Sequence, residues 1–303
     1  MGVPQALVQQ AAPLGERRIQ QAIARLQALP AFYPTVQKAL RLIADPLSGN
    51  SHIQQVISTD QAISARILEL ANSAYFGHYS EVRTLSLALT LVGREKLATV
   101  LRRFLSEELL SMLSGRKPAA SHIREMSVAT AAVAHAMAER LVRSDKEELL
   151  LAGLLHNIGE LVLLSQFRDQ YEQMLRLGDR LPRAEAEKAA FGVESGLVGK
   201  WLLEAWSFPP LFPALIERLA DPWSANFPEA PLTAIAIVYT ARQLAEHWIA
   251  DDRPATPAAP QAEAFAQSLP ARLLSTLEVD GQFLADLYVQ LPGELARISE
   301  VLL

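Results

Sequence analysis

Residues 67–77 read ILELANSAYFG, and this stretch decides most of what the sequence says about the fold. Apolar residues recur between Ile63 and Ala71 at spacings of three and four, which is typical of one buried face of an α-helix. Asp60 precedes this stripe, and Gly77 is a good stop for a helix. The stretch therefore predicts a helix that begins after Asp60 and ends around Asn72.

Helical spacing also recurs outward from this stretch in both directions. Alternating strand patterns are scarce, and β-branched residues are spread thinly among Ala and Leu. Ser51 and Gln54 match a capping box for a short helix upstream. Downstream, Ser114-Gly115 and Pro118 interrupt the pattern, and we interpret this break as the seam between two helical subdomains. The sequence predicts an all-α fold.

Composition excludes several classes of function. The chain has 303 residues, of which 50% are hydrophobic, so it can form a sizeable core. It contains no cysteine, which excludes disulfides, thiolate metal sites and a cysteine nucleophile. The net charge is −5 and the basic clusters are short, so we expect no nucleic-acid partner.

The chain shows no targeting or membrane signal. Its first residues lack a basic segment followed by a long apolar one, which argues against a signal peptide. No uninterrupted apolar run reaches the roughly 18 residues that cross a bilayer. We therefore expect a cytoplasmic protein with no membrane span.

Several motifs, taken together in their order and spacing, resemble the HDOD family, a non-enzymatic relative of the HD phosphohydrolases. In the first half, Leu29-Pro30, Asp45-Pro46 and the ANSAYFG run at 71–77 match the family. In the second half, AGLLHNIGELVL at 152–163 is similar to the family's GLLHDIGKLVL-like segment. The resemblance implies an HD-domain-like multi-helical fold and the following division: an N-terminal extension (1–25), an HDOD domain (26–225) made of an N-terminal helical subdomain (26–115) and a degenerate HD-like subdomain (116–225), and a helical C-terminal extension (226–303) with a loop at 251–264.

The resemblance also bears on metal binding, because HD enzymes hold divalent metals with His and Asp side chains from different helices. Of the six histidines, only His156 falls on a family metal position, and its neighbour is Asn157 where an Asp is needed. The other ligand positions align near residues that cannot ligate a metal well: Met126, Ser195, Leu219 and Ala220. The resemblance therefore implies a degenerate remnant at His156 and Asn157, with no catalytic residues, no metal and no cofactor.

Other matching residues are expected to be structural. We expect Asn72 to join its helix to the following turn through local hydrogen bonds, and we interpret His156 as a hydrogen-bonded residue at a helix end. A sharper alternative makes His156 part of a pocket for a small phosphate-bearing molecule. The family-hallmark structural residues are Asn72, Ser73, Gly153, Gly159, Trp206 and Pro209.

The resemblance favours a bacterial signal-transduction module that acts through protein–protein interaction. Two alternatives remain open. The first is a metal-dependent HD-type phosphohydrolase of nucleotides or cyclic dinucleotides. The second is a small-molecule sensor with a pocket lined by an aromatic stripe: Trp201, Trp206, Phe208 and Phe212. The partner is not identified by the sequence, which allows a homodimer and a monomer equally.

Overall fold

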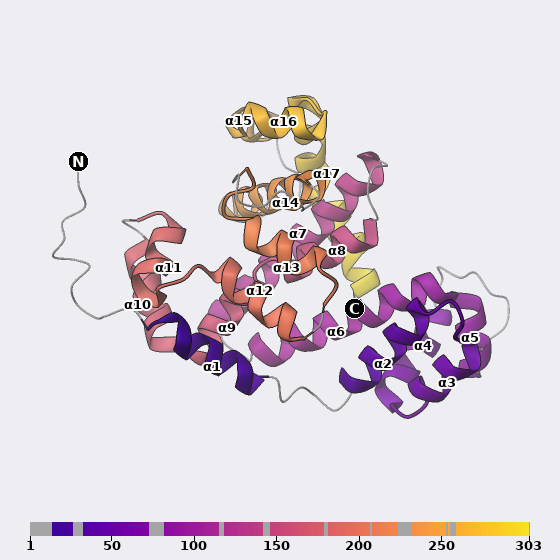
Figure 1. Ribbon diagram of the computed structural model, residues 1–303. Helices are drawn as coiled ribbons and strands as arrows, with labels where there is room; N and C mark the ends of the chain where they lie inside the picture. The colour runs from indigo at the N-terminus through magenta and orange to yellow at the C-terminus, as the bar shows by residue number, and fades with distance from the viewer. Residues whose placement is uncertain are drawn as a thin grey trace. The chain divides into compact units, whose positions relative to one another are not determined.

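The computed structural model describes residues 14–26, 33–72, 82–114, 118–141, 146–178, 181–206, 208–223, 232–252, 254 and 259–302. Every regular element within these residues is an α-helix (Figure 1), which confirms the all-α prediction. Ser73 and most of the ANSAYFG run lie outside the described residues.

The chain divides into two compact units, one formed by residues 28–111 and the other by residues 1–27 together with 112–303. The seam that we expected at 114–118 therefore lies a few residues earlier, inside a continuous helix. The described part of the segment expected as a separate extension, residues 14–25, belongs to the larger unit. The reason is that Ile19, Ala22 and Ile23 are buried, and their helix packs against residues 195–205.

The smaller unit is built mostly on short helices. Its apolar core includes Val36, Ile57, Ile63 and Ile67, each at most 1% exposed. The helices are α2 (Tyr33–Ala44), α3 (Asn50–Ile57), α4 (Gln61–Ala71), α5 (Leu85–Val92) and most of α6 (Arg94–Ser114).

Hydrogen bonds to backbone groups fix several helix ends in this unit. The α4 start follows Asp60 as predicted, and the Asp60 Oδ1 atom accepts a hydrogen bond of 3.1 Å from the Ile63 N–H. The capping box expected at Ser51 is wrong, because the N-cap of α3 lies two residues earlier, at Gly49, which makes no side-chain bond. At the end of α2, Arg94 donates to four backbone carbonyls, those of Leu42, Ile43, Asp45 and Ser48.

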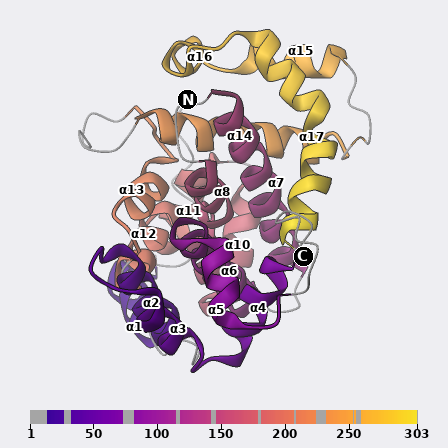
Figure 2. The same cartoon turned by 90° about the vertical axis from the view of Figure 1, so that its right-hand side faces the viewer.

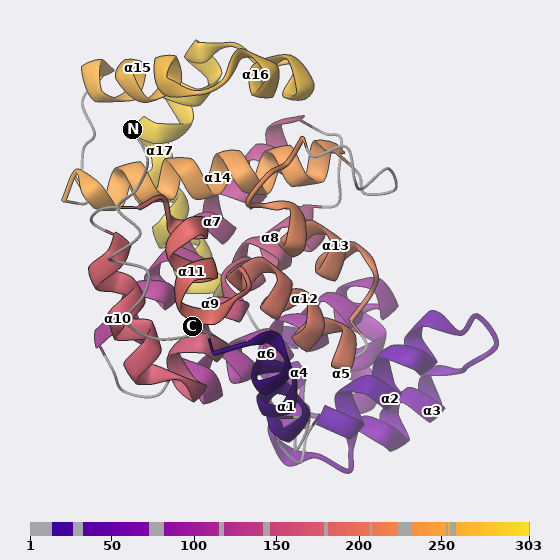
Figure 3. The same ribbon diagram turned by 60° about the vertical axis from the view of Figure 1, so that its left-hand side comes forward.

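The larger unit is organised around α7, α8 and α14. Ala-rich α7 packs closely against both of the others (Figure 2), because many of its buried side chains are alanines. Figure 3 shows α14 between the α15–α16 pair and α8 with α13. The helices are α1 (Glu16–Leu26), α7 (Pro118–Leu141), α8 (Lys146–Leu155), α9 (Ile158–Gln166), α10 (Arg168–Gly178), α11 (Arg183–Phe191), α12 (Ser195–Ala205), α13 (Leu211–Arg218), α14 (Leu232–Ala250), α15 (Ala259–Ser268), α16 (Ala271–Leu277) and α17 (Gly281–Leu302).

The C-terminal segment forms part of this unit's core. Ten residues of α14 are buried, so the region expected as an extension packs into the larger unit. The loop expected at 251–264 is shorter than predicted, because α15 already begins at Ala259. Pro260 lies in the first turn of this helix, where the missing N–H of proline costs nothing.

One described stretch, Glu148–Gln166, is long and apolar enough by length and composition to cross a membrane, although His156, Asn157 and Glu160 interrupt its apolar residues. Within the fold, 78% of its 18-residue window is buried, and a turn at 156–157 divides it into α8 and α9. Its apolar character corresponds to core packing.

Candidate functional site

The His156–Asn157 turn joins α8 to α9 at a point where helices approach each other closely. A Cβ atom on Gly153 would lie 2.5 Å from the Ala131 Cα of α7. A Cβ atom on Gly159 would lie 1.9 Å from the Ser195 carbonyl oxygen. The two glycines therefore allow α8 to touch α7 and α9 to touch α12, and these contacts fix the position of the turn.

His156 is buried, with 7% of its surface exposed, and its ring bonds within its own helix. The Nδ1 atom donates to the Gly153 carbonyl oxygen at 2.7 Å, which leaves Nε2 as the ring nitrogen with a lone pair. Burial and, to a smaller extent, the nearby cation of Arg242 together lower the pKa of His156 to about 4, against the opposing effects of Gly153 and Glu160. The ring is therefore neutral near pH 7.

This lowered pKa predicts a pH-dependent stability. The unfolded chain binds a proton on His156 below the ordinary histidine pKa of 6.5, whereas the folded chain resists protonation until the pH falls to about 4. The free energy of unfolding should fall as the pH drops through this window, by up to about 3 kcal/mol. Urea unfolding at stepped pH should show a smaller loss in His156→Gln. The exposed-site control His52→Gln should keep the pH dependence of the unmodified chain, and equal curves for all three proteins would contradict the prediction.

Asn157 uses its side chain to fasten the turn to α7. Its Nδ2 atom donates to the Ile123 carbonyl oxygen at 2.9 Å, and its Oδ1 atom accepts from the Ser127 hydroxyl at 2.7 Å. Although Asn157 occupies the N-cap position of α9, its side chain makes no capping bond there. Both ends of the amide are thus engaged by another helix.

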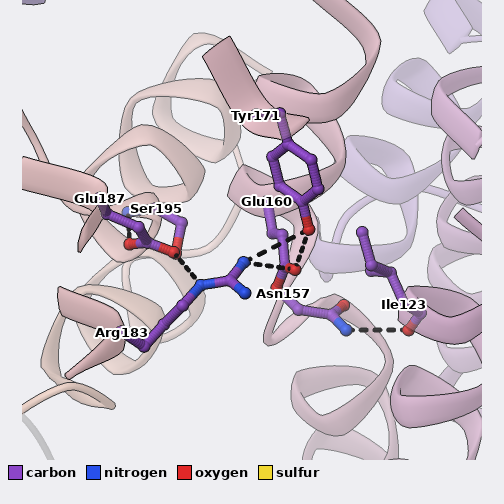
Figure 4. A network of polar contacts seen from close by, with 7 residues as sticks. All are labelled: Ile123, Asn157, Glu160, Tyr171, Arg183, Glu187 and Ser195. Carbon is purple, nitrogen blue, oxygen red and sulfur yellow. Dashed lines mark hydrogen bonds and ion pairs between the residues drawn. The ribbon is translucent and has the colours of Figure 1, made fainter. Parts of the chain in front are cut away.

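Glu160, one turn further on, is the centre of a polar network (Figure 4). Its carboxylate accepts from the Tyr171 hydroxyl of α10 and, at 2.5 Å, from the Arg183 guanidinium of α11. Arg183 Nε also donates to Glu187 at 2.9 Å, and the other Glu187 oxygen accepts from the Ser195 N–H at 2.7 Å. The network joins α9, α10, α11 and α12.

Protonation states in this network follow from burial and charge. Burial, together with the Glu160 carboxylate, raises the pKa of Tyr171 well above its usual value. The carboxylates of Glu160 and Glu187 outweigh burial and raise the pKa of Arg183. Tyr171 therefore stays a hydroxyl donor and Arg183 a cation, which is what the observed bonds require.

The residues aligned with family metal ligands have different environments and form no common ligand set. Met126 packs in an apolar cluster with Ala129 and Ala245, Leu219 is buried, and Ala220 is exposed. Ser195 donates its backbone N–H to the Glu187 carboxylate. Among the described residues, no group of three or more His, Cys, Asp or Glu side chains could hold a metal ion. These donors do not fit the HD-type metal that the fold class implies.

Comparison with known proteins assigns the fold to a family. The HDOD domain family model matches residues 29–222. This chain belongs to the HDOD family. The comparison with curated proteins gave no match.

Solved structures with the same fold include proteins of three bacteria. A Shewanella amazonensis protein provisionally named a phosphohydrolase is 23% identical, with 94% of this chain and 98% of that chain covered and a TM-score of 0.67. An HDOD domain protein of unknown function from Geobacter sulfurreducens is 20% identical, with 95% and 99% covered and a TM-score of 0.64. A Marinobacter aquaeolei protein provisionally named a signal-transduction protein is 17% identical, with 99% and 69% covered and a TM-score of 0.66.

The HDOD hallmark residues that the structure describes have backbone and packing roles. Asn72 donates to the Leu68 and Val82 carbonyls, at 2.8 and 2.9 Å, and accepts from the Val82 N–H at 2.7 Å. These bonds hold the end of α4 to the backbone of Val82, and the turn that the sequence predicted after Asn72 lies outside the described residues. Trp206 is 1% exposed at the end of α12. Pro209 accepts from the Phe212 N–H at 3.1 Å through its carbonyl, at the start of α13.

The aromatic stripe proposed as a ligand cradle lies largely in the core. Trp206, Phe208 and Phe212 are buried, and Trp201 is half-buried. The rings of Phe208 and Phe212 meet edge to face, with centroids 6.0 Å apart. This arrangement is that of a packed interior.

Sequence reasoning missed the residues that surround the HDOD remnant. Ser127, next to the aligned Met126, is the α7 side chain that contacts Asn157. The Glu160–Tyr171–Arg183–Glu187 network was also missed. The four-residue spacing of Arg183 and Glu187 on a predicted helix was a usable signal, but nothing in the pattern marks Glu187 as buried.

Proposed function

We propose that this HDOD protein is a non-enzymatic module of bacterial signal transduction that acts in the cytoplasm by binding protein partners. The observation that carries the proposal is that most polar side-chain atoms of the His156–Asn157 turn already form hydrogen bonds within the protein. Both amide atoms of Asn157 bond to α7, and His156 Nδ1 bonds to Gly153. The one remaining imidazole nitrogen is too few ligands for a catalytic divalent cation, which typically takes about three from the protein. The similarity to the Marinobacter protein is consistent with a signalling role.

The proposal is tested by cross-linking the purified full chain in a lysate of its source bacterium, followed by mass spectrometry. The control bait is an unrelated helical protein of similar size and charge. We expect at least one protein to be enriched with the HDOD chain alone, at cross-links that map to reproducible positions. Failure to enrich any partner, or metal-dependent hydrolysis of a phosphodiester by the purified chain, would overturn the proposal.

The competing function is a metal-dependent phosphohydrolase, which the provisional name of the Shewanella protein brings into consideration. Asn157→Asp restores the His-Asp pair and so tests it. The new carboxylate would face the Ile123 carbonyl, which now accepts an N–H bond of 2.9 Å. Loss of this donor should lower the free energy of unfolding by about 2–3 kcal/mol, with no gain of bound metal.

Chemical denaturation and elemental analysis measure the two effects. Asn50→Asp is the matched control, because Asn50 is exposed in the first turn of α3, where a negative charge is well tolerated. A stable Asn157→Asp protein carrying near-stoichiometric Mn, Fe or Zn would support the hydrolase instead.

A further inference from the structure

The last helix, α17, is anchored very differently along its two halves. Residues 281–291 contribute five buried side chains: Leu284, Ala285, Leu287, Tyr288 and Leu291. The Tyr288 hydroxyl donates to Asp251 at 2.6 Å, and its ring stacks on Phe265 with centroids 6.0 Å apart. This first half is part of the core of the larger unit.

The helix is easier to bend just after this first half, at Pro292 and Gly293. Pro292 lies inside the helix and has no N–H, so the helical bond to the Tyr288 carbonyl is missing. Gly293 comes next, and a Cβ atom there would meet nothing within 4 Å. A proline and a glycine in succession lower the cost of bending the helix between its two halves.

Beyond this point, two of the described side chains form ion pairs with α7. Arg297 lies 3.1 Å from Glu139, and Arg140 lies 3.6 Å from Glu294. The side chains of the Arg297–Glu139 pair are 46% and 40% exposed, so dissolved salt can screen this pair. Lys146, 2.7 Å from Glu139, completes the group.

The charges of this group are present at neutral pH. Hydrogen bonds from Lys146 and Arg297 lower the pKa of Glu139 to about 2, against a smaller opposing effect of burial. The bonds from α7 to α17 thus persist under ordinary conditions, and ionic strength is the variable that weakens them.

The second half of α17 covers apolar surface. Leu295 and Ile249 pack against the buried cluster of Met126, Ala129 and Ala245 from α7 and α14. Withdrawal of Leu295 would expose this cluster beside the charges of Glu139 and Arg140. Such a face, apolar with one acid and one base at its edge, suits an amphipathic helix.

We propose that residues 294–302 are a strap that pivots at Pro292–Gly293, and that they occupy in cis a docking face on α7 and α14 that a partner helix takes when the strap opens. The partner helix carries a leucine-like side chain in place of Leu295, an acid before it and an arginine or lysine after it. This chemistry matches Glu294, Leu295 and Arg297, which fill the face now. The inference rests on the proposed function, because it identifies the surface through which the module binds.

Hydrogen exchange of the full chain tests the pivot. Raising NaCl from 50 mM to 1 M should speed exchange of amides 294–302 by at least about ten-fold, while amides 283–291 change little. Arg297→Gln should produce the same acceleration at 50 mM. Arg168→Gln, which breaks an exposed pair with Glu172 on α10, is the control and should leave α17 unchanged. If exchange rates are uniform along α17 and change with neither salt nor Arg297→Gln, the strap is wrong.

A labelled peptide of residues 288–303 tests the docking face in trans. It should bind the full-length Leu295→Ala, Arg297→Gln chain at least about ten-fold more tightly than the unmodified chain, because the cis strap no longer competes. Equal binding to both, or binding to neither, would overturn the docking face. Cross-linking of the unmodified chain to a partner elsewhere on its surface would refute this face while leaving the proposed function intact.

Discussion

Gly159→Ala is expected to destroy the packing of the larger unit. The new Cβ atom would lie 1.9 Å from the Ser195 carbonyl oxygen and 2.5 Å from the Gly199 nitrogen. Both are backbone atoms, so relief requires α9 and α12 to separate, with a loss of about 4 kcal/mol or more in the free energy of unfolding. Thermal unfolding by calorimetry and solubility on expression measure this loss.

The matched control is Gly281→Ala in α17. There the added Cβ atom would meet its nearest neighbour, the Ala266 Cβ atom, at 3.6 Å, which is ordinary contact. We expect this variant to be unchanged or slightly more stable, by a few tenths of a kcal/mol at roughly the scale of helix propensities. If the two alanine variants unfold at the same temperature, the close approach of α9 to α12 is wrong.

Arg183→Ala is expected to be the most damaging single change in the polar network. It would leave Glu187, whose side chain is 4% exposed, as a buried carboxylate without its cation, and it would also remove the cation from Glu160. Breaking one partner of a fully buried pair typically costs about 3–5 kcal/mol, and the 37% exposure of the Arg183 side chain places the expected loss at the lower end of this range. The turn before α12 should loosen as well, because Glu187 also binds the Ser195 N–H.

Arg168→Ala provides a control with the same residue types and the same spacing of four. The side chains of the Arg168–Glu172 pair are 58% and 43% exposed, and water and salt screen such pairs so well that they contribute little to stability. Arg183→Lys should lie between the two, because a single ammonium cannot reproduce the fork of a guanidinium toward two carboxylates. Denaturant unfolding of the three variants compares them, and similar losses for Arg183→Ala and Arg168→Ala would contradict the buried network.

The sequence was informative wherever the determining interactions are local. The apolar spacing around Ile63 and Ile67 predicted α4, and the backbone bonds of Asn72 at the end of this helix reach only segments nearby in the chain. The His156–Asn157 pair was recognisable because adjacent residues form the motif. Helix periodicity and local hydrogen bonds can be predicted from the order of neighbouring residues.

Contacts that depend on assembly of the chain left no such trace. The bond from Asn157 to the Ile123 carbonyl involves a backbone atom 34 residues away, and any residue type supplies that carbonyl. The inclusion of α1 in the larger unit depends on a helix formed by residues 195–205. Burial of Glu187 likewise results from the packing of α11 and α12, and its own sequence neighbourhood resembles a solvated face.

The bonds of Asn72 affect how variable the neighbouring chain can be. The Asn72 amide donates to the Val82 carbonyl and accepts from the Val82 N–H, ten positions along the chain. These two bonds hold the ends of the intervening stretch together. Closure entropy rises slowly with length, by about 0.6 kcal/mol per doubling. Insertions between these anchors should therefore lower the free energy of unfolding less than substitution of the anchoring amide does.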